Sequence, residues 1–206
     1  MLPRRRLRAG RCGPASGDRR PGKVTSRAVR GLIGLAAALL ALAGAEPTGL
    51  TAPCSHPPRP DALPQARVVR VVDGDTVRAR LDGGEERIRL IGLDAPERFP
   101  GPRLEHQARQ TGVPPEALRR WANAAYTFAR RSLAGRAVGL ELDVQQRDEF
   151  GRLLAYVWTG RVLFNLELVR QGYAWAHPVP PNLRYAERFT ACQQDAQAAR
   201  RGLWGR

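Results

Sequence analysis

Lysine is almost absent from this chain: Lys23 is the only one among 206 residues, so arginine carries the basic charge. Lysine and arginine together number 34 against 19 acidic residues, a formal net charge of +15. Residues 1–45 hold ten of the basic residues and one acidic residue, which leaves 24 minus 18, or +6, for the rest. A composition rich in Arg, Ala, Gly and Pro is also typical of a GC-rich genome. The residual charge is therefore only weak support for a polyanionic partner.

Histidine and cysteine are scarce as well, with three of each. Neither falls within the acidic motifs described below, which argues against zinc there. Cys12 lies in the N-terminal segment, whereas Cys54 and Cys192 lie near the two ends of the remaining chain. In an oxidising compartment the latter two are a candidate disulfide that would tie the N-terminal tail to the last helix. The alternative is a pair of free thiols, because the sequence does not give the distance between them.

The apolar run of residues 31–45 has 15 residues, whereas a membrane span needs about 20. It follows an arginine-rich stretch and ends in Ala43-Gly44-Ala45, small residues suited to a signal peptidase. We expect residues 1–45 to be a secretory signal peptide, with an uncleaved membrane anchor through 31–45 as the alternative. The protein is therefore predicted to be exported, either secreted or held in the periplasm or cell envelope.

Beyond this segment, proline-rich residues 46–65 predict an extended linker and residues 66–206 one folded domain. Five segments have strand patterns, the first three forming an antiparallel meander: 66–72, 75–81, 85–91, 137–144 and 153–158. Helical patterns follow the third and fifth of these segments. A short piece from Arg103 is interrupted by Pro114-Pro115, and longer or later helices are predicted at 115–133, 164–170 and 182–200. This order predicts a mainly β, α+β domain: a five-stranded OB-fold Greek-key barrel with about three packed helices.

Aromatic residues mark one face of the long predicted helix. Trp121, Ala125 and Phe128 recur at spacings of four and three within 115–133. Residues at these spacings lie on the same side of an α-helix. We expect all three to face the core.

Two acidic motifs lie at the ends of predicted strands, Asp73-Gly74-Asp75-Thr76 and Asp94-Ala95-Pro96-Glu97. Neighbouring strands lie about 4.8 Å apart, so Asp75 and Asp94 can share one cation, with the Ala95 carbonyl as a third oxygen. Such oxygen donors suit Ca²⁺. For the first motif alone, a simple turn around Gly74 is the favoured alternative. With both motifs present, the sequence predicts a calcium site.

Two arginines and a glutamate accompany these motifs. Arg89 lies on the third predicted strand and Arg152 at the start of the fifth. Guanidinium groups match two phosphate oxygens and stabilise added negative charge, although salt bridges to Asp148 or Glu149 are the alternative. Glu97 lies in a stiff loop after Pro96, where its carboxylate can orient a water and accept a proton.

Several runs match a known pattern in the same order: Val72–Thr76, Arg89–Glu97, Asp148–Val157 and Asn165–Ala174. Together they make the stretch from about Ala66 to Trp204 resemble the thermonuclease family, whose members are similar to staphylococcal nuclease. The resemblance implies an OB-fold barrel and calcium-dependent hydrolysis of phosphodiesters in DNA and RNA. It also implies roles for six residues: Asp75, Asp94 and the Ala95 carbonyl on calcium, Arg89 and Arg152 on the scissile phosphate, and Glu97 as general base.

Three departures from the family pattern bear on the substrate. Ala95 stands where the family commonly has threonine, so the carbonyl remains but a hydroxyl is lost. Trp175–Pro181 occupies the stretch where the family's best-known member has tyrosines beside the bound nucleotide, which leaves base preference open. The basic segment 98–116 is longer than usual. It can contact a nucleic-acid backbone, but we expect a solvated surface loop.

The predicted partners follow from these motifs. DNA and RNA are the expected substrates of a monomer with no stable protein partner, and membrane contact is expected only through the N-terminal segment. One alternative is a non-catalytic OB-fold module that binds nucleic acid. Another is a basic surface protein that adheres to polyanions. Degenerate copies of this domain are expected to lose acidic or arginine positions, and all five proposed side chains are present, which favours an endonuclease.

Overall fold

The structure, a computed structural model, describes residues 54–205. The predicted signal peptide or anchor, Cys12 and the first part of the predicted linker, residues 46–53, lie outside the described residues. Within 54–205, no helix has the length and apolar character that crossing a bilayer requires.

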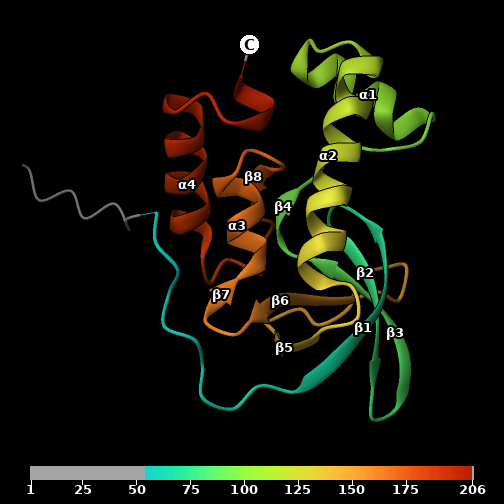
Figure 1. Cartoon of the computed structure of the whole chain (residues 1–206), viewed down its shortest axis with the longest axis vertical. Coiled ribbons are helices and arrows are strands. Elements are labelled where there is room, and N and C mark those ends of the chain that lie inside the picture. Colours follow the sequence, from blue (N-terminus) through green and yellow to red (C-terminus); the bar gives the residue numbers. More distant parts are fainter. Residues whose placement is uncertain (1–53, 206) are drawn as a thin grey trace, which may run out of the picture. The chain divides into compact units, whose positions relative to one another are not determined.

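Five strands form a closed barrel, as predicted (Figure 1). They are β1 (Gln65–Asp73), β2 (Thr76–Leu81), β3 (Gly84–Leu90), β5 (Ala137–Glu141) and β6 (Leu153–Thr159). Neighbours in the order β3-β2-β1-β5-β6 are antiparallel, and β3 closes the barrel by pairing in parallel with β6. Alternate residues of these strands fill the interior, including Val68, Val77, Ile88, Leu140 and Val157, each no more than 1% exposed. The barrel therefore has a packed core, and function lies on its outside.

Three short strands were not predicted, because two or three residues are too few to show alternation. β7 (Val162–Leu163) extends the sheet beyond β6, whereas β4 (Gly92–Asp94) pairs with β8 (Trp175–His177) in a separate two-stranded sheet. This second sheet matters for the site, because β4 ends at Asp94.

The three packed helices that the sequence predicts are α2 (Pro115–Leu133), α3 (Phe164–Arg170) and α4 (Ala186–Ala198). The short helical piece predicted from Arg103 is α1 (Pro102–Thr111), which lies beside α2, and a 3₁₀ turn, η1 (Gly202–Trp204), follows α4 (Figure 1). α4 begins four residues later than predicted, because the Asn182 side chain exchanges two hydrogen bonds with the Gln145 backbone, at 2.8 and 2.9 Å, within a turn.

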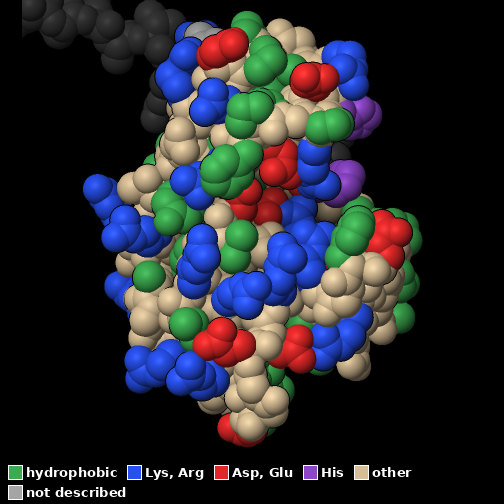
Figure 2. Space-filling view, turned by 90° about the vertical axis from the view of Figure 1, so that its right-hand side faces the viewer, with side chains coloured by type: hydrophobic (Ala, Val, Ile, Leu, Met, Phe, Trp, Pro, Cys, Tyr) green, Lys and Arg blue, Asp and Glu red, His purple; other side chains and the backbone are tan. Residues whose placement is uncertain are grey.

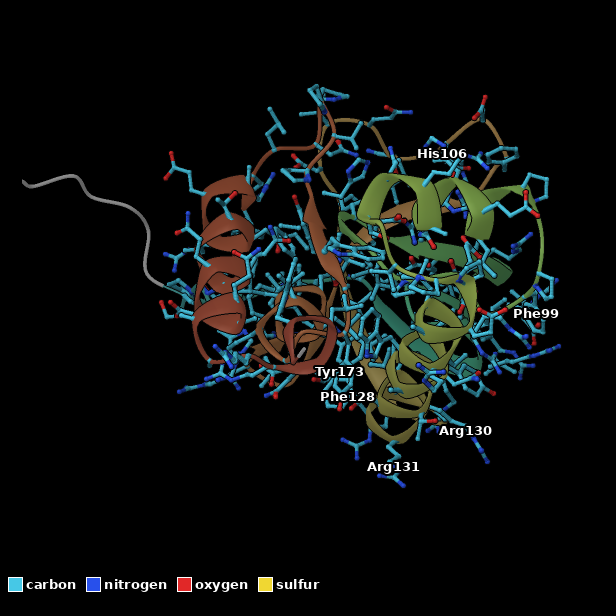
Figure 3. All side chains as sticks on the ribbon, turned by 90° about the horizontal axis from the view of Figure 1, so that it is seen from above. Phe99, His106, Phe128, Arg130, Arg131 and Tyr173 are labelled. Carbon is cyan, nitrogen blue, oxygen red and sulfur yellow. A yellow bond between two sulfur atoms is a disulfide. The ribbon has the colours of Figure 1, made fainter. Side chains whose placement is uncertain are left out.

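The core face of α2 differs from the one predicted. Its fully buried residues are Leu118, Ala122, Ala125, Ala129 and Leu133. The expectation for Ala125 is therefore confirmed, but the aromatic residues at 121 and 128 are only partly buried. The Phe128 ring stacks against the rings of Phe164 and Tyr173, with centroids 5.7 and 4.8 Å apart. Figure 3 shows Phe128 beside Tyr173. Small side chains face the barrel because α2 packs close to it.

Helix α4 presses against the connection between β3 and β4. Gly92, the first residue of β4 after that connection, has a φ of 84°, and a Cβ atom there would lie 2.3 Å from a ring carbon of Phe189. The buried Asn165 of α3 holds the same connection, since its amide donates to the Ile91 carbonyl at 2.9 Å. The chain that leads from Arg89 to Asp94 is therefore held by two helices.

Residues 54–64 contain no helix or strand, yet they are attached to the domain. Cys54 and Cys192 form a disulfide with Cα atoms 4.5 Å apart. Arg188 of α4 donates to the Ser55 carbonyl at 3.0 Å, and Leu140 N–H donates to the Pro64 carbonyl at 2.9 Å. The tail is therefore fixed at both of its described ends.

Replacing both cysteines, Cys54→Ser with Cys192→Ser, should lower the free energy of unfolding by about 2–5 kcal/mol, because the bond closes a long loop in the unfolded chain. Urea denaturation without reductant measures the difference. With dithiothreitol, wild type and double variant should unfold alike. Equal stability without reductant would show that the bond is not formed.

Candidate active site

The first acidic motif forms a tight turn between β1 and β2. Asp75 is 7% exposed. Its two carboxylate oxygens accept hydrogen bonds from the Thr76 hydroxyl and the Ala95 N–H, each at 3.0 Å. A Cβ atom at Gly74 would lie 3.0 Å from the methyl groups of both Ala95 and Ala125. Small residues at these positions let α2 pack directly over the turn. The hydrogen bond from Ala95 to Asp75 joins the two acidic motifs.

Arg89 bridges the two carboxylates predicted to converge. One terminal nitrogen contacts the Asp75 carboxylate, and the other lies 2.7 Å from Asp94 Oδ1. Burial lowers the pKa of Arg89, and the Asp94 charge offsets this only in part. The guanidinium remains a cation because its ordinary pKa is far above neutral pH. Asp75 and Asp94 therefore lie within reach of a single cationic group. Arg89 itself is held by these carboxylates.

Segment 98–116 is not only the solvated surface loop that we expected, because it contains α1, the short helical piece predicted from Arg103. Pro102 in the first turn and Gly112 after the last, with a φ of 65°, are ordinary start and stop signals that bracket this helix. From α1, Arg103 reaches the second acidic motif. It donates to Asp94 Oδ1 at 2.6 Å and contacts the Glu97 carboxylate.

Gln107 of α1 is the residue that sequence reasoning missed. It is 4% exposed, and its amide nitrogen donates to Asp94 Oδ2 and to the Ala95 carbonyl, each at 3.0 Å. Its amide oxygen accepts the Glu97 N–H at 2.9 Å. One side chain thus holds three residues of the predicted site. Leu104 and Gln107 share the buried face of α1, but no sequence rule identifies a glutamine in such a role.

Asp73 closes the turn around Gly74, which is the alternative that the sequence offered for the first acidic motif. Its carboxylate accepts the Gly74 N–H at 2.9 Å. Burial raises the pKa of Asp73 to about 6, and the charge of Glu97 adds to this, whereas the Gly74 hydrogen bond and two arginines lower it. Asp73 therefore has a structural part in the motif, beside Asp75.

Arg152 forms the salt bridge with Asp148 that the sequence left open. Its backbone N–H and its Nε both donate to that carboxylate, at 2.9 and 2.6 Å. Burial alone would raise the pKa of Asp148, but the hydrogen bonds from Arg152 outweigh it and lower the pKa. No described residue bonds the two terminal nitrogens of Arg152, whose guanidinium lies 5.4 Å from the exposed Phe150 ring.

These groups meet at a cleft of about 510 Å³, whose lining includes Arg89, Asp94, Gln107 and Arg152. Figure 2 shows it as a recess with acidic side chains inside, arginines beside them and histidines at the rim. Asp75 and Glu97 do not line the cleft but touch residues that do.

The stretch Trp175–Pro181, which stands where the family's best-known member has tyrosines, lies only partly at this cleft. Trp175 packs against a small apolar cluster made by α1 and α2. His177, Val179 and Pro180 line the cleft opposite the arginines' strands. Among the described residues that line the cleft, the only Phe, Tyr or Trp ring is that of Phe150, which is 72% exposed.

The oxygen donors available to a cation are few. Within residues 54–205, no group of three or more His, Cys, Asp or Glu side chains is arranged to hold a metal. Two carboxylates, Asp75 and Asp94, and the Ala95 carbonyl are instead brought together by the hydrogen bonds above. Only hard oxygen donors are present, so this set fits Ca²⁺ or a similar cation that completes its shell with water.

Comparisons with known proteins agree with this geometry. A model of the family described as "Staphylococcal nuclease homologue" matches residues 87–206. The chain is 36% identical over 138 residues to a thermonuclease of Staphylococcus hyicus, covering 67% of this chain and 74% of that protein. It is 37% identical over 139 residues to a thermonuclease of Staphylococcus intermedius, covering 68% and 75%. Endonuclease YncB of Bacillus subtilis (strain 168) is 26% identical over 139 residues, covering 66% and 60%.

Gln107→Glu should lower the free energy of unfolding by about 1–3 kcal/mol, because the carboxylate cannot donate to Asp94 and the Ala95 carbonyl and adds a like charge beside Asp94. Urea denaturation at neutral pH measures it. Gln110→Glu is the matched control, since this exposed residue lies on the same helix and undergoes the same change. Equal stability of the two variants would contradict the role given to Gln107.

Proposed function

Because this chain belongs to the family of staphylococcal nuclease homologues and is an endonuclease that hydrolyses phosphodiester bonds, we propose that it cuts both DNA and RNA in a calcium-dependent reaction. The observation that carries the proposal is the convergence of two carboxylates, two arginines and a glutamate around one cleft. The nuclease relatives favour this over a barrel that binds nucleic acid without cutting it.

Asp75, Asp94 and the Ala95 carbonyl are the proposed calcium ligands. Their donor atoms are all oxygens, and the hydrogen bonds of Gln107 orient two of the three groups. A carbonyl oxygen has two lone pairs, so the Ala95 oxygen can accept the Gln107 hydrogen bond and still face a cation. When bound, calcium would supply Lewis-acid stabilisation of a phosphoryl oxygen.

Arg89 and Arg152 are the proposed ligands of the scissile phosphate. Both line the cleft: Arg89 lies on β3, and Arg152 directly precedes the neighbouring strand β6. Arg89 binds Asp75 and Asp94 through its two terminal nitrogens, and Arg152 binds Asp148 through Nε, so both guanidinium groups are oriented before substrate arrives. Their charge at any working pH stabilises the additional negative charge that develops as water attacks phosphorus.

Glu97 is the proposed general base. Its backbone is held by Gln107, and its carboxylate, 26% exposed on its side chain, is in contact with Arg103. Water can therefore reach the carboxylate, which can accept a proton once substrate draws the Arg103 guanidinium away. Arg103 is exposed and long, so this exchange needs only a rotamer change.

Export is the proposed setting of this activity. The arginine-rich stretch followed by an apolar run in residues 1–45 supports it. The Cys54–Cys192 disulfide supports it independently, because such bonds persist in oxidising compartments. We further propose a monomer that contacts membrane only through its N-terminal segment.

Addition of a calcium chelator should abolish DNA and RNA digestion, and calcium should restore it. Calcium at about a hundred times its dissociation constant should also raise the free energy of unfolding by about 2.7 kcal/mol. Asp94→Asn should remove this stabilisation, whereas Asp82→Asn in the exposed β2–β3 turn should keep it. Cleavage that persists under chelation would overturn the metal assignment.

Arg89→Lys and Glu97→Ala should each lower kcat by about 10²–10³-fold, because each removes one group that stabilises or generates the transition state. Near-ultraviolet circular dichroism should stay native in both. Arg161→Lys, in an exposed turn, is the control. A near-normal rate in either variant would remove that residue from the mechanism.

A further inference from the structure

Three arginines stand in a row across the outer face of the first three strands. Arg70 of β1 lies opposite Arg78 of β2, which in turn lies opposite Arg87 of β3. All three are exposed. Residues directly opposite each other in an antiparallel pair have Cβ atoms about 4.5–5.5 Å apart on the same face, so these cations are immediate neighbours.

No described acidic side chain is paired with the row. Among residues 54–205, no hydrogen bond or ion pair joins Arg70, Arg78 or Arg87 to another side chain. The next arginine on β2 shows the ordinary arrangement, since Arg80 lies opposite Glu85 and binds it at 3.0 Å. Like charges placed directly opposite each other destabilise a sheet. An external anion would remove that cost.

A bulge creates the row. The pairing of β1 with β2 shifts between Val68 and Arg70, so that Val69 is left over. In the register of Val68 with Ala79, the partner of Arg78 would be Val69; the extra residue brings Arg70 there instead. Bulges are common next to active sites, where they redirect a side chain.

The row adjoins the site. Arg87 lies two residues before Arg89 on β3, which puts both on one face of that strand, about 6.6–6.8 Å apart along it. Arg78 lies two residues after Thr76, the partner of Arg89. Figure 2 shows arginine side chains continuing across the surface beside the acidic recess.

We propose that Arg70, Arg78 and Arg87 bind the sugar–phosphate backbone of a polynucleotide strand on one side of the scissile phosphate. The proposal rests on the nuclease function above and narrows its substrate to polymeric nucleic acid rather than small diesters. Guanidinium groups in a line suit a chain of phosphates. Exposed bases are not needed, so the row adds affinity without sequence preference.

The test compares Arg78→Gln/Arg87→Gln with a control that removes the same charge, Arg130→Gln/Arg131→Gln. The control arginines lie in the last turn of α2 and point away from α1 and the cleft-lining His106 (Figure 3). Binding of fluorescently labelled single-stranded DNA is followed by anisotropy, in chelator, over a range of salt concentrations. The slope of log affinity against log salt should fall by about 1.4 for the row variant, because each phosphate that an arginine neutralises contributes about 0.7. The control should keep the wild-type slope.

Cleavage separates the two proposals. In the presence of calcium, cleavage rates are measured on long DNA and on thymidine p-nitrophenyl phosphodiester, which is too short to reach the row. The ratio of the first rate to the second should be at least about tenfold lower in the row variant than in wild type. An unchanged salt slope, or an equal fold-loss on the small diester, would overturn the row. A wild-type protein that binds DNA through the row but cuts neither substrate would leave the row standing and refute the proposed function. If heparin displaced the labelled DNA as well as unlabelled DNA does, in both the row variant and the control, the result would also count against the arginine row.

Discussion

The site depends on one buried guanidinium held between two carboxylates. Arg89 lies on a barrel strand, and its neighbours Asp75 and Asp94 come from two other segments of the chain. Burial makes each charge costly alone, and their mutual contact offsets that cost. The same contacts hold the arginine and both acids in fixed positions. A cation that binds the acids would therefore act on the arginine as well, so in the proposed reaction metal and phosphate binding would be coupled.

The barrel supplies the strands, but helices complete the site. Gln107 and Arg103 reach it from α1, a helix in a segment that departs from the family pattern. Gln107 satisfies two acceptors and one donor in a place that water barely reaches. A buried polar group without such partners would destabilise the fold, so α1 and the second acidic motif stabilise each other.

The residues that alternate or repeat on a helical period could be predicted from the sequence. The five barrel strands and α2 followed from such patterns. Asp75 and Asp94 followed from their places at strand ends, and Arg89 from its place on a strand and the family resemblance. The core face of α2 did not, because Trp121 and Phe128 find partners outside the barrel. Gln107 did not either, since its role exists only when α1 folds over Asp94. The arginine row depends on a bulge at Val69, which no period in the sequence indicates.

The close contact between Gly92 and Phe189 makes the geometry of the site depend on the position of α4. Since the ring fills the space of a side chain at position 92, α4 cannot shift without freeing the strand that leads to Asp94. Local opening of α4 would thus release β4 together with Asp94, so activity would be lost at the temperature at which this helix opens.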